Sequence, residues 1–515
     1  MKNGSVITIL SLVVFLFAGC ASLDPPDIAS SPDQEITPAQ QEALEMIGKD
    51  SELLSRSYQT ALGIQLPFWR TAAIRNVAEV YSAAGDYEKA ATIIMTMPDA
   101  LVRAEALNRV SEEAWDKGST VPAGQLLRDA QDQIETVENP HERAYGLALL
   151  GRNIGIQGDK EKAVDVLLQA NEEANSVENM QQKAFDLTLI AEFLADNGEI
   201  EKSGEILSEA YRIANHIDDT EVRITTMDRI AYLLEKDSQY DEARDVEDNI
   251  DEAITHGAAP DRVAFYYLTR AQFAKAYDSA LRIDNPYSKV YTLAKIGERA
   301  WKKGDVSLGT EMLDVAVETS EQIEDVFFRD RSREKLVVVF CQLGQPARAA
   351  QIIELLEKEG SRDSALQTLA WGYAHLGQYN RAADTVARIE IPRYKTDAYY
   401  EIGKTHLDSG RKTQAVAQFT QARQTAESIS NQHLKDEIHS KIATAFAECD
   451  QPADGLKVAE EIQDPYYKET AWYNVADYYH TRGNDSETLR LADQMANPYY
   501  KSSVLTWQAR RKDFS

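Results

Sequence analysis

A turn residue recurs twelve times along this chain, and successive copies lie either 33 or 40 residues apart. Nine of the copies are glycine, and an alanine usually follows five residues later. The twelve positions are Gly85, Gly118, Gly158, Gly198, Ser238, Ala271, Gly304, Gly344, Gly377, Gly410, Asp450 and Gly483. A short unit that returns at fixed intervals predicts a stacked array in which each repeat packs only against its neighbours. The length of 515 residues therefore reflects the number of repeats rather than a number of globular domains.

Each repeat is predicted to be a helical hairpin. In the last full unit, apolar residues fall at three- and four-residue steps on both sides of Gly483, which indicates two amphipathic helices. Glycine suits the turn because it adopts the left-handed conformation without a Cβ penalty. The two unit lengths differ by one heptad, about two helical turns, which we assign to the second helix. We expect an all-α fold, an α-solenoid of about twelve hairpins that forms a superhelix.

Small and large residues occupy fixed places within the hairpin. A small residue usually precedes the turn by seven positions, and a large one such as Tyr81, Phe340 or Phe446 often precedes it by four. Another small residue, such as Ala90, follows the turn by five positions. Small side chains opposite large ones allow two helices to interlock. We therefore expect these aromatic residues in the core rather than in a ligand site.

This order of small residue, aromatic, glycine and alanine resembles the tetratricopeptide repeat (TPR), a helix–turn–helix unit of about 34 residues. The resemblance covers residues 64–515. It implies a concave surface built from the first helix of each hairpin, where partners bind. In the C-terminal half it places these candidate residues in the groove: Tyr291, Trp301, Lys302, Trp371, His375, Tyr400, Lys404, Tyr473, Asp477 and His480. The alternative is that each of these side chains adds to the packing between repeats.

A second motif marks the joint between consecutive repeats, for example IDNPYSK from residue 283 and IQDPYYK from residue 462. Proline ends the outgoing helix and fits the first turn of the next one. The seventh residue of the joint is basic except in the copy with His256: Arg70, Arg103, Arg143, Lys183, Arg223, Lys289, Arg329, Arg362, Lys395, Lys435, Lys468 and Lys501. A positive charge in the first turn opposes the helix dipole. We expect these side chains to bind the carbonyls that end the preceding helix, or a carboxylate of a neighbouring repeat. A basic ladder that recruits an anionic ligand is the alternative.

The start of the chain has the features of a secretory signal. A lysine precedes an apolar stretch at residues 6–17, which is too short to span a bilayer. The AGC sequence that ends at Cys20 resembles the lipobox of bacterial lipoproteins, although Phe17 stands where leucine is usual. The resemblance implies cleavage before Cys20, lipidation of that cysteine and anchoring in a membrane. If the host is a Gram-negative bacterium, the resemblance also implies the outer membrane, because Ala21 rather than aspartate follows the cysteine.

We divide the chain into five segments. They are a lipoprotein signal peptide (1–19), the lipidated cysteine with a disordered tether (20–37), an N-terminal helical cap (38–63), the TPR-like array (64–498) and a C-terminal capping helix (499–515). The tether is rich in Pro, Ser and Asp and has little to bury. We expect residues 499–511 to form a lone first helix that serves as a solvating cap or a docking surface.

Composition and missing motifs restrict the function. The net charge of −29 argues against nucleic-acid binding, because an acidic surface repels a phosphate backbone. Cys341 and Cys449 lie three repeats apart, too far for a disulfide, and the spacing of His433 and His439 does not suit a shared metal. Motifs for phosphate loops, dinucleotide binding and nucleophilic hydrolysis are absent from the sequence. We therefore expect no catalytic residue, no cofactor and no metal site.

The leading hypothesis is a membrane-anchored scaffold of the bacterial cell envelope, bound through its lipid to the outer membrane and facing the periplasm. It would bind other envelope proteins or peptides in the concave groove, without chemistry of its own. The alternative is a solute-binding accessory lipoprotein that works with a transporter, which predicts an enclosed, apolar-lined cavity. A third class, an enzyme with an unrecognised site, would need an insertion that the uniform spacing does not provide.

Overall fold

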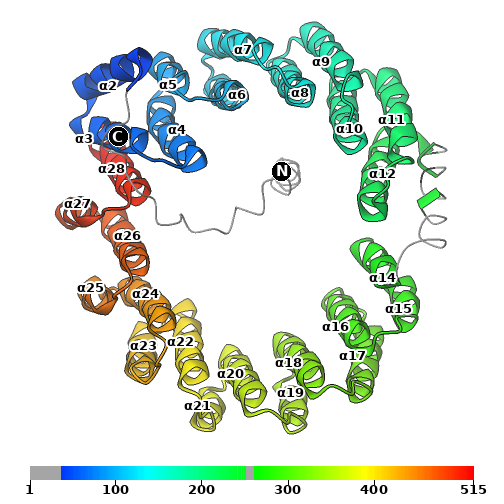
Figure 1. The fold of residues 1–515 in the computed structure, drawn as a ribbon, viewed down its shortest axis with the longest axis vertical. Helices are drawn as coiled ribbons and strands as arrows, with labels where there is room; N and C mark the ends of the chain where they lie inside the picture. The colour runs from blue at the N-terminus through cyan, green and yellow to red at the C-terminus, as the bar shows by residue number, and fades with distance from the viewer. Residues whose placement is uncertain (1–35, 241, 245, 247–248, 251–259, 515) are drawn as a thin grey trace. The chain divides into compact units, whose positions relative to one another are not determined.

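The computed structural model describes residues 36–514, except residues 241, 245, 247–248 and 251–259. Within this part the chain is a series of helical hairpins, so the predicted all-α repeat fold is confirmed (Figure 1). The predicted signal segment, Cys20 and His256 lie outside the described residues. No described helix is both long enough and apolar enough to cross a membrane.

The helices fall into first and second members of hairpins. Two helices come before the first hairpin: α2 (Pro38–Asp50) and α3 (Glu52–Leu62). The first helices are α4 (Pro67–Ala84), α6 (Ala100–Asp116), α8 (Pro140–Ile156), α10 (Met180–Asp196), α12 (Thr220–Lys236), α14 (Pro260–Thr269), α16 (Pro286–Lys302), α18 (Val326–Gln342), α20 (Glu359–His375), α22 (Pro392–Asp408), α24 (Gln432–Glu448), α26 (Pro465–Thr481) and α28 (Pro498–Asp513). The second helices are α5 (Tyr87–Ile94), α7 (Thr120–Glu135), α9 (Lys160–Asn175), α11 (Ile200–Ala214), α15 (Phe273–Leu281), α17 (Val306–Glu321), α19 (Pro346–Ile353), α21 (Tyr379–Ala387), α23 (Lys412–Ala426), α25 (Pro452–Glu461) and α27 (Asp485–Gln494).

The two unit lengths arise in the second helix, as predicted. The first helices α6, α8, α10, α12, α16, α18, α20, α22, α24 and α26 each have 17 residues. The second helices of the 40-residue units (α7, α9, α11, α17 and α23) have 15 or 16 residues. Those of the 33-residue units (α5, α15, α19, α21 and α25) have 8 to 10. Because a heptad is close to two turns, the longer helix keeps the same face toward its partner.

All twelve turn residues adopt the left-handed conformation, with φ between 56° and 101°, the three non-glycine residues included. At the end of α4, the Gly85 N–H donates to Ser82 O at 3.0 Å, and the Asp86 N–H donates to Tyr81 O at 2.9 Å. These two bonds satisfy carbonyls that the helix end would otherwise leave without a donor. The positions read from the sequence are thus the points at which the chain reverses.

The two helices of a hairpin approach most closely at the small residues. A Cβ placed on Gly403 of α22 would lie 2.5 Å from Phe419 Cε1 of α23. A Cβ placed on Gly309 of α17 would lie 2.7 Å from the carbonyl oxygen of Gly297 in α16. Of the large residues predicted for the core, three are buried (Tyr81, Phe340 and Phe446) and three are partly buried (Tyr267, Tyr373 and Tyr479).

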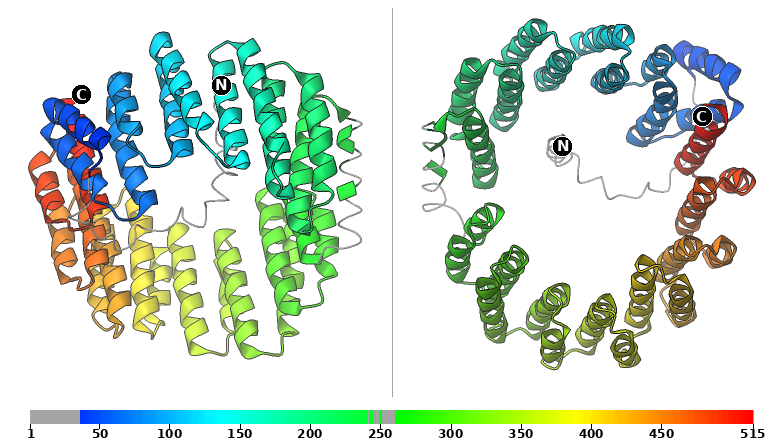
Figure 2. Two further views of the ribbon diagram at one scale, coloured as in Figure 1. Left: turned by 45° about the horizontal axis from the view of Figure 1, so that its top comes forward. Right: turned by 180° about the vertical axis from the view of Figure 1, so that it is seen from behind.

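The described residues form two compact units, one from residues 36–133 and 462–514, the other from those between 134 and 461. In the second unit, first helices contact one another in the pairs α8–α10, α10–α12, α14–α16, α16–α18, α18–α20, α20–α22 and α22–α24. The second helices α9, α11, α15, α17, α19, α21 and α23 each contact the first helices before and after them, as α17 contacts α16 and α18. First helices therefore form one layer of this unit and second helices the other (Figures 1 and 2).

In the first unit, the last helix of the chain packs against helices near its start. α28 contacts α3 and α4 as well as α26 and α27, and Figures 1 and 2 show it beside α3. The Ser57 hydroxyl of α3 donates to Ser502 O at 2.8 Å and lies 2.7 Å from Thr506 Oγ1. The expectation of a lone helix at residues 499–511 is therefore wrong, because α28 packs against α3 and α4.

Candidate partner-binding surface

The ten groove candidates belong to two groups, one in each unit. The second unit holds Tyr291, Trp301, Lys302, Trp371, His375, Tyr400 and Lys404, and the first unit holds Tyr473, Asp477 and His480. Lys302, His375 and Asp477 are exposed, and the other seven are partly buried. For six of the ten, the contacts of the side chain decide between the groove and the packing interpretation.

Three candidates of the second unit pack between helices. The ring of Tyr400 lies 5.6 Å from that of Phe419 in the same hairpin, and burial is the largest cause that raises its pKa. Trp301 packs against the hydrophobic core of this unit, and its indole N–H is buried without a hydrogen-bond partner among the described residues. Lys404 Nζ forms an ion pair of 2.8 Å with Glu448 of the next repeat. These contacts favour the packing interpretation for all three side chains.

In the first unit, α28 covers part of the candidate group. The ring of Tyr473 lies 4.7 Å from that of Tyr500 and 5.0 Å from that of Trp507. His480 Nδ1 lies 3.1 Å from Gln508 Nε2. Burial is the largest cause that raises the pKa of Tyr473 and that lowers the pKa of His480. Tyr473 and His480 therefore join the last helix to the array.

Tyr291 belongs instead to a group of aromatic side chains at the N-terminal ends of α16 and α18. We define the aromatic cluster as Tyr287, Tyr291, Phe327 and Phe328. Ring centroids lie 5.0 Å apart for Tyr287 and Tyr291, 5.2 Å for Tyr287 and Phe328, and 5.4 Å for Phe327 and Phe328. Phe327 is 55% exposed and Phe328 is 46% exposed. Contiguous exposed aromatic side chains are typical of the energetic centres of binding surfaces.

Sequence reasoning found only Tyr291 among these four residues. The signal for the others was present in the joint motif, because Tyr287 follows the proline of IDNPYSK and the two phenylalanines precede the arginine of IEDVFFR. From the sequence, that motif predicts a corner and a basic residue, which binds within the protein or belongs to a basic ladder. The exposure of large aromatic side chains at such a corner is visible only in the structure.

Seven of the twelve basic residues of the joints donate to the carbonyl six residues earlier, as predicted. Six of them are arginines, and their bonds to the carbonyl oxygen are 2.6 to 2.9 Å long: Arg70 to Ile64, Arg103 to Met97, Arg143 to Val137, Arg223 to Ile217, Arg329 to Ile323 and Arg362 to Leu356. Lys395 donates to Ile389 O at 3.0 Å, and Lys435 pairs with Glu427 at 2.5 Å. Since these side chains are engaged within the protein, the basic-ladder interpretation does not hold for them.

Buried carboxylates complete the joints, and sequence reasoning missed them. Asp330, which is fully buried in α18, accepts from the backbone N–H groups of Glu357 and Lys358 at the next joint. Asp363 of α20 accepts in the same way from the backbone N–H groups of Glu390, at 2.9 Å, and Ile391, at 2.7 Å. Each carboxylate thereby holds the start of the following hairpin. Among 84 acidic residues, nothing in the sequence distinguished them.

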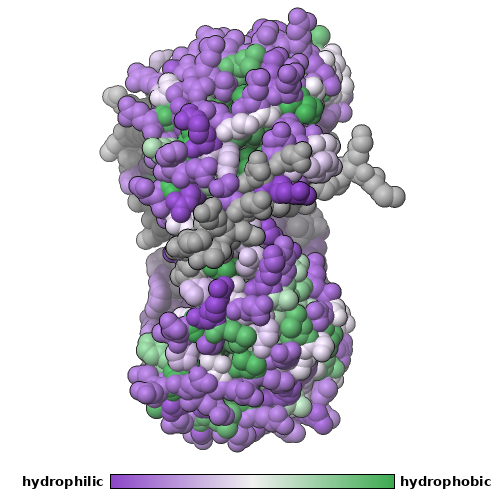
Figure 3. Space-filling view, turned by 90° about the vertical axis from the view of Figure 1, so that its right-hand side faces the viewer, coloured by the Kyte–Doolittle hydropathy of each residue, from purple (hydrophilic) through white to green (hydrophobic). Residues whose placement is uncertain are grey.

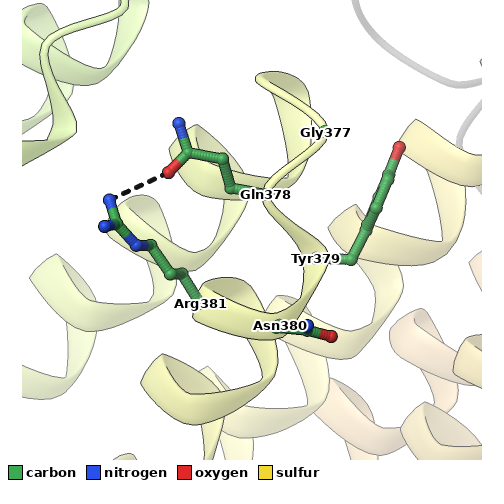
Figure 4. Close-up of a pocket in the computed structure, with 5 residues that line it drawn as sticks. All are labelled: Gly377, Gln378, Tyr379, Asn380 and Arg381. Carbon is green, nitrogen blue, oxygen red and sulfur yellow. Dashed lines mark hydrogen bonds between the residues drawn. The ribbon is translucent and has the colours of Figure 1, made fainter.

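Two hollows on the surface are open to solvent. One, of about 550 Å³, lies at the turn between α20 and α21 and is lined by five consecutive residues, 377–381 (Figure 4). There Arg381 donates to Gln378 at 3.1 Å, while the side chain of Tyr379 points to the other side of the turn. A site from one turn alone offers few converging groups, so this hollow makes a poor ligand site.

The other hollow, of about 1030 Å³, lies between α5 and α7 in the first unit. α5 has 8 residues and α7 has 16, so part of α7 extends beyond the length of α5. The lining combines apolar Met95 and Val121 with acidic Asp129 and Asp132. On the face that Figure 3 shows, apolar patches are likewise separated by hydrophilic side chains.

The two cysteines of the array, Cys341 and Cys449, are buried and free. Burial raises the pKa of Cys341 to about 12, so its thiol is protonated at neutral pH. A protonated, buried thiol is a poor nucleophile. Both cysteines therefore act as small core residues.

Comparison with known proteins gives one family match. A sequence model of the tetratricopeptide repeat matches residues 396–423, which comprise most of α22 and α23. No curated protein matches the chain.

Several solved structures are similar at low sequence identity. Ton1535 from Thermococcus onnurineus NA1 is 18% identical over 77% of this chain and 97% of its own, with a TM-score of 0.28. A chain of the Naa15/Naa10 complex bound to HypK-THB is 14% identical over 94% of this chain and 75% of its own, with a TM-score of 0.39. The apo form of the quorum sensor NprR from B. thuringiensis is 12% identical over 70% of this chain and 99% of its own, with a TM-score of 0.25. Because these TM-scores lie below 0.5, the likenesses extend neither to partners nor to activity.

Proposed function

We propose that this TPR-like helical repeat protein is a membrane-anchored scaffold of the bacterial cell envelope that binds partner proteins or peptides on its first helices. TPR-like folds generally bind partner proteins or peptides through such surfaces. The envelope location, the lipid anchor and the absence of catalysis are parts of this proposal. Its membrane contact is the lipid anchor alone, and nucleic acid is not among its partners.

The aromatic cluster is the observation that carries the binding part of the proposal. Its side chains come from two consecutive first helices, and Lys358 at the start of a third lies 5.1 Å from the ring of Phe327. Large aromatic groups bury much apolar area when a partner covers them, and a cation beside them adds specificity. The cluster is held in place by a rigid helical joint, so a partner would meet a surface already formed.

The sequence around Cys20 supports the envelope part of the proposal. A signal followed by a lipobox-like cysteine and a tether rich in Pro, Ser and Asp fits an array held away from a membrane. With Ala21 after the cysteine, we propose the outer membrane, with the array in the periplasm. The solute-binding alternative requires an enclosed apolar cavity, whereas the two hollows described above are open.

A photo-crosslinking amino acid at position 328 is expected to capture a partner in living cells. Position 121 in α7 is the matched control, because Val121 is 80% exposed but belongs to a second helix. Adducts would be identified by mass spectrometry. The double substitution Phe327→Ser and Phe328→Ser should then weaken binding of that partner at least about tenfold, whereas Val121→Ser should leave it unchanged. Equal adducts from both positions, or unchanged binding of the double variant, would contradict a binding role for the cluster.

Cys20→Ala is expected to release the chain from the membrane fraction. Without the thiol, no thioether-linked lipid can form. The lipid is the only membrane anchor that we propose, and no described helix could span a membrane in its place. Cell fractionation with metabolic labelling by palmitate checks this outcome. Cys341→Ser serves as the control, because that thiol is buried in α18 and should not affect labelling. Retention of the label in Cys20→Ala would rule out the anchor while leaving the binding surface untouched.

A further inference from the structure

A buried histidine in α24 has no hydrogen-bond partner. The side chain of His439 is 1% exposed, and neither of its ring nitrogens has a partner among the described residues. Buried imidazole nitrogens are normally satisfied, because an unpaired polar group in the interior loses its contacts with water. An imidazole can bind a metal ion through the lone pair of either ring nitrogen. The imidazole ring of His439 is therefore suited to bind a ligand that comes from outside the protein.

Two carboxylates converge on this ring from the neighbouring helices. Glu427 directly follows α23, and Glu461 is the last residue of α25. Glu427 Oε1 lies 3.6 Å from His439 Nε2. One ligand atom from each of Glu427, His439 and Glu461 can be chosen so that all three lie within 4.8 Å of one another. Three consecutive helices therefore bring one imidazole and two carboxylates to one point.

The ion pairs of Glu427 and Glu461 leave carboxylate oxygens that can still bind a cation. Lys435 pairs with Glu427 through Oε2 at 2.5 Å, which leaves Oε1 on the side of His439. Arg423 pairs with both oxygens of Glu461, but each carboxylate oxygen can accept more than one interaction. The two glutamates are exposed, so their side chains can move the short distance that coordination requires. Arg423 and Lys435 compete with a metal for the carboxylates.

We propose that Glu427, His439 and Glu461 form a binding site for a divalent transition metal, with zinc as the best fit. Zinc accepts both imidazole nitrogen and carboxylate oxygen, at about 2.0–2.2 Å, whereas calcium and magnesium prefer oxygen ligands alone. Three protein ligands leave a fourth position for water or for a ligand of a partner. The metal would link two consecutive hairpins, because Glu427 belongs to one and the other two ligands belong to the next. The sequence predicts no metal site, because its cysteines and histidines lack metal-ligand spacing, but Glu427 and Glu461 come close to His439 only in the folded chain.

Zinc titration of the full chain, after removal of metal with a chelator, tests this site. Calorimetry should show a zinc-binding step of one ion per chain, and zinc should raise the melting temperature. His439→Gln should reduce the affinity of this step at least tenfold and abolish the rise. His433→Gln is the matched control and should leave both unchanged. Magnesium at the same concentration should produce neither effect.

Two further variants separate loss of coordination from loss of folding. Glu461→Gln removes a ligand at an exposed position, and it should weaken zinc binding while circular dichroism stays unchanged. Arg423→Gln removes the competing cation, and it should strengthen zinc binding. Equal zinc binding by the wild type and His439→Gln, or weaker binding by Arg423→Gln in a folded chain, would overturn the proposal.

Discussion

Deletion of residues 498–515 is expected to lower the free energy of unfolding of the first unit by several kcal/mol and to expose α3 to solvent. Val504 and Leu505 are fully buried in α28. Burial of such a side chain contributes about 1.5–3 kcal/mol, so these two alone account for about 3–6 kcal/mol. The deletion also leaves the Ser57 hydroxyl without Ser502 and Thr506. Hydrogen exchange followed by mass spectrometry should show faster exchange in α3 than in the helices of the second unit.

Point variants of α28 control for the size of the deletion. Leu505→Ala should cost about 2–5 kcal/mol, because truncation of this fully buried side chain leaves a cavity. Arg510→Ala, on the exposed side of the same helix, should change stability by no more than about 0.5 kcal/mol. If the truncated chain retains the wild-type exchange rates in α3, the contact between α3 and α28 is not what stabilises this helix.

Local rules explain why so much of each hairpin could be predicted from the sequence. A left-handed turn needs a residue such as Gly85 at one position, and a seven-residue insertion is tolerated only where it preserves the buried face. The interaction of Arg329 with Ile323 O involves residues six positions apart, so the motif itself contains both partners. When the residues that produce a structural feature all lie within one repeat, the same residues recur from repeat to repeat. Such a feature can therefore be recognised in the sequence.

The pairing of α3 with α28 has no such local cause. Ser57 and Ser502 are 445 residues apart, and the sequence of α3 has no turn residue at the repeat spacing. Tyr473 and His480 were consequently assigned to an open groove, although α28 lies against them. The position of a residue within its repeat predicts which helix face it occupies, but the neighbour that covers that face depends on the rest of the chain.

Gly455→Val is expected to lower the free energy of unfolding of the second unit by about 1–3 kcal/mol, since side chains forced into a packed interior carry costs of this size. Gly455 follows the turn residue Asp450 by five positions and faces Ala443, which precedes that turn by seven. A Cβ at position 455 would lie 2.4 Å from the Ala443 carbonyl oxygen. This oxygen belongs to the backbone of α24 and cannot rotate away, so α24 and α25 must move apart. Denaturant unfolding monitored by circular dichroism measures the change.

Gly124→Val in α7 is the matched control, because it makes the same substitution within a helix where space is available. The nearest atom to a Cβ at position 124 is Arg128 Nη1, at 3.8 Å and at the end of a flexible side chain. Valine and glycine differ little in helix propensity, so this variant should change stability by no more than about 0.5 kcal/mol. Equal effects of the two substitutions would show that helix propensity, and not the distance between helices, governs position 455. A large effect at Gly455 alone would give the physical reason why small residues recur at both places in the repeat: they set how closely the two helices of a hairpin can pack.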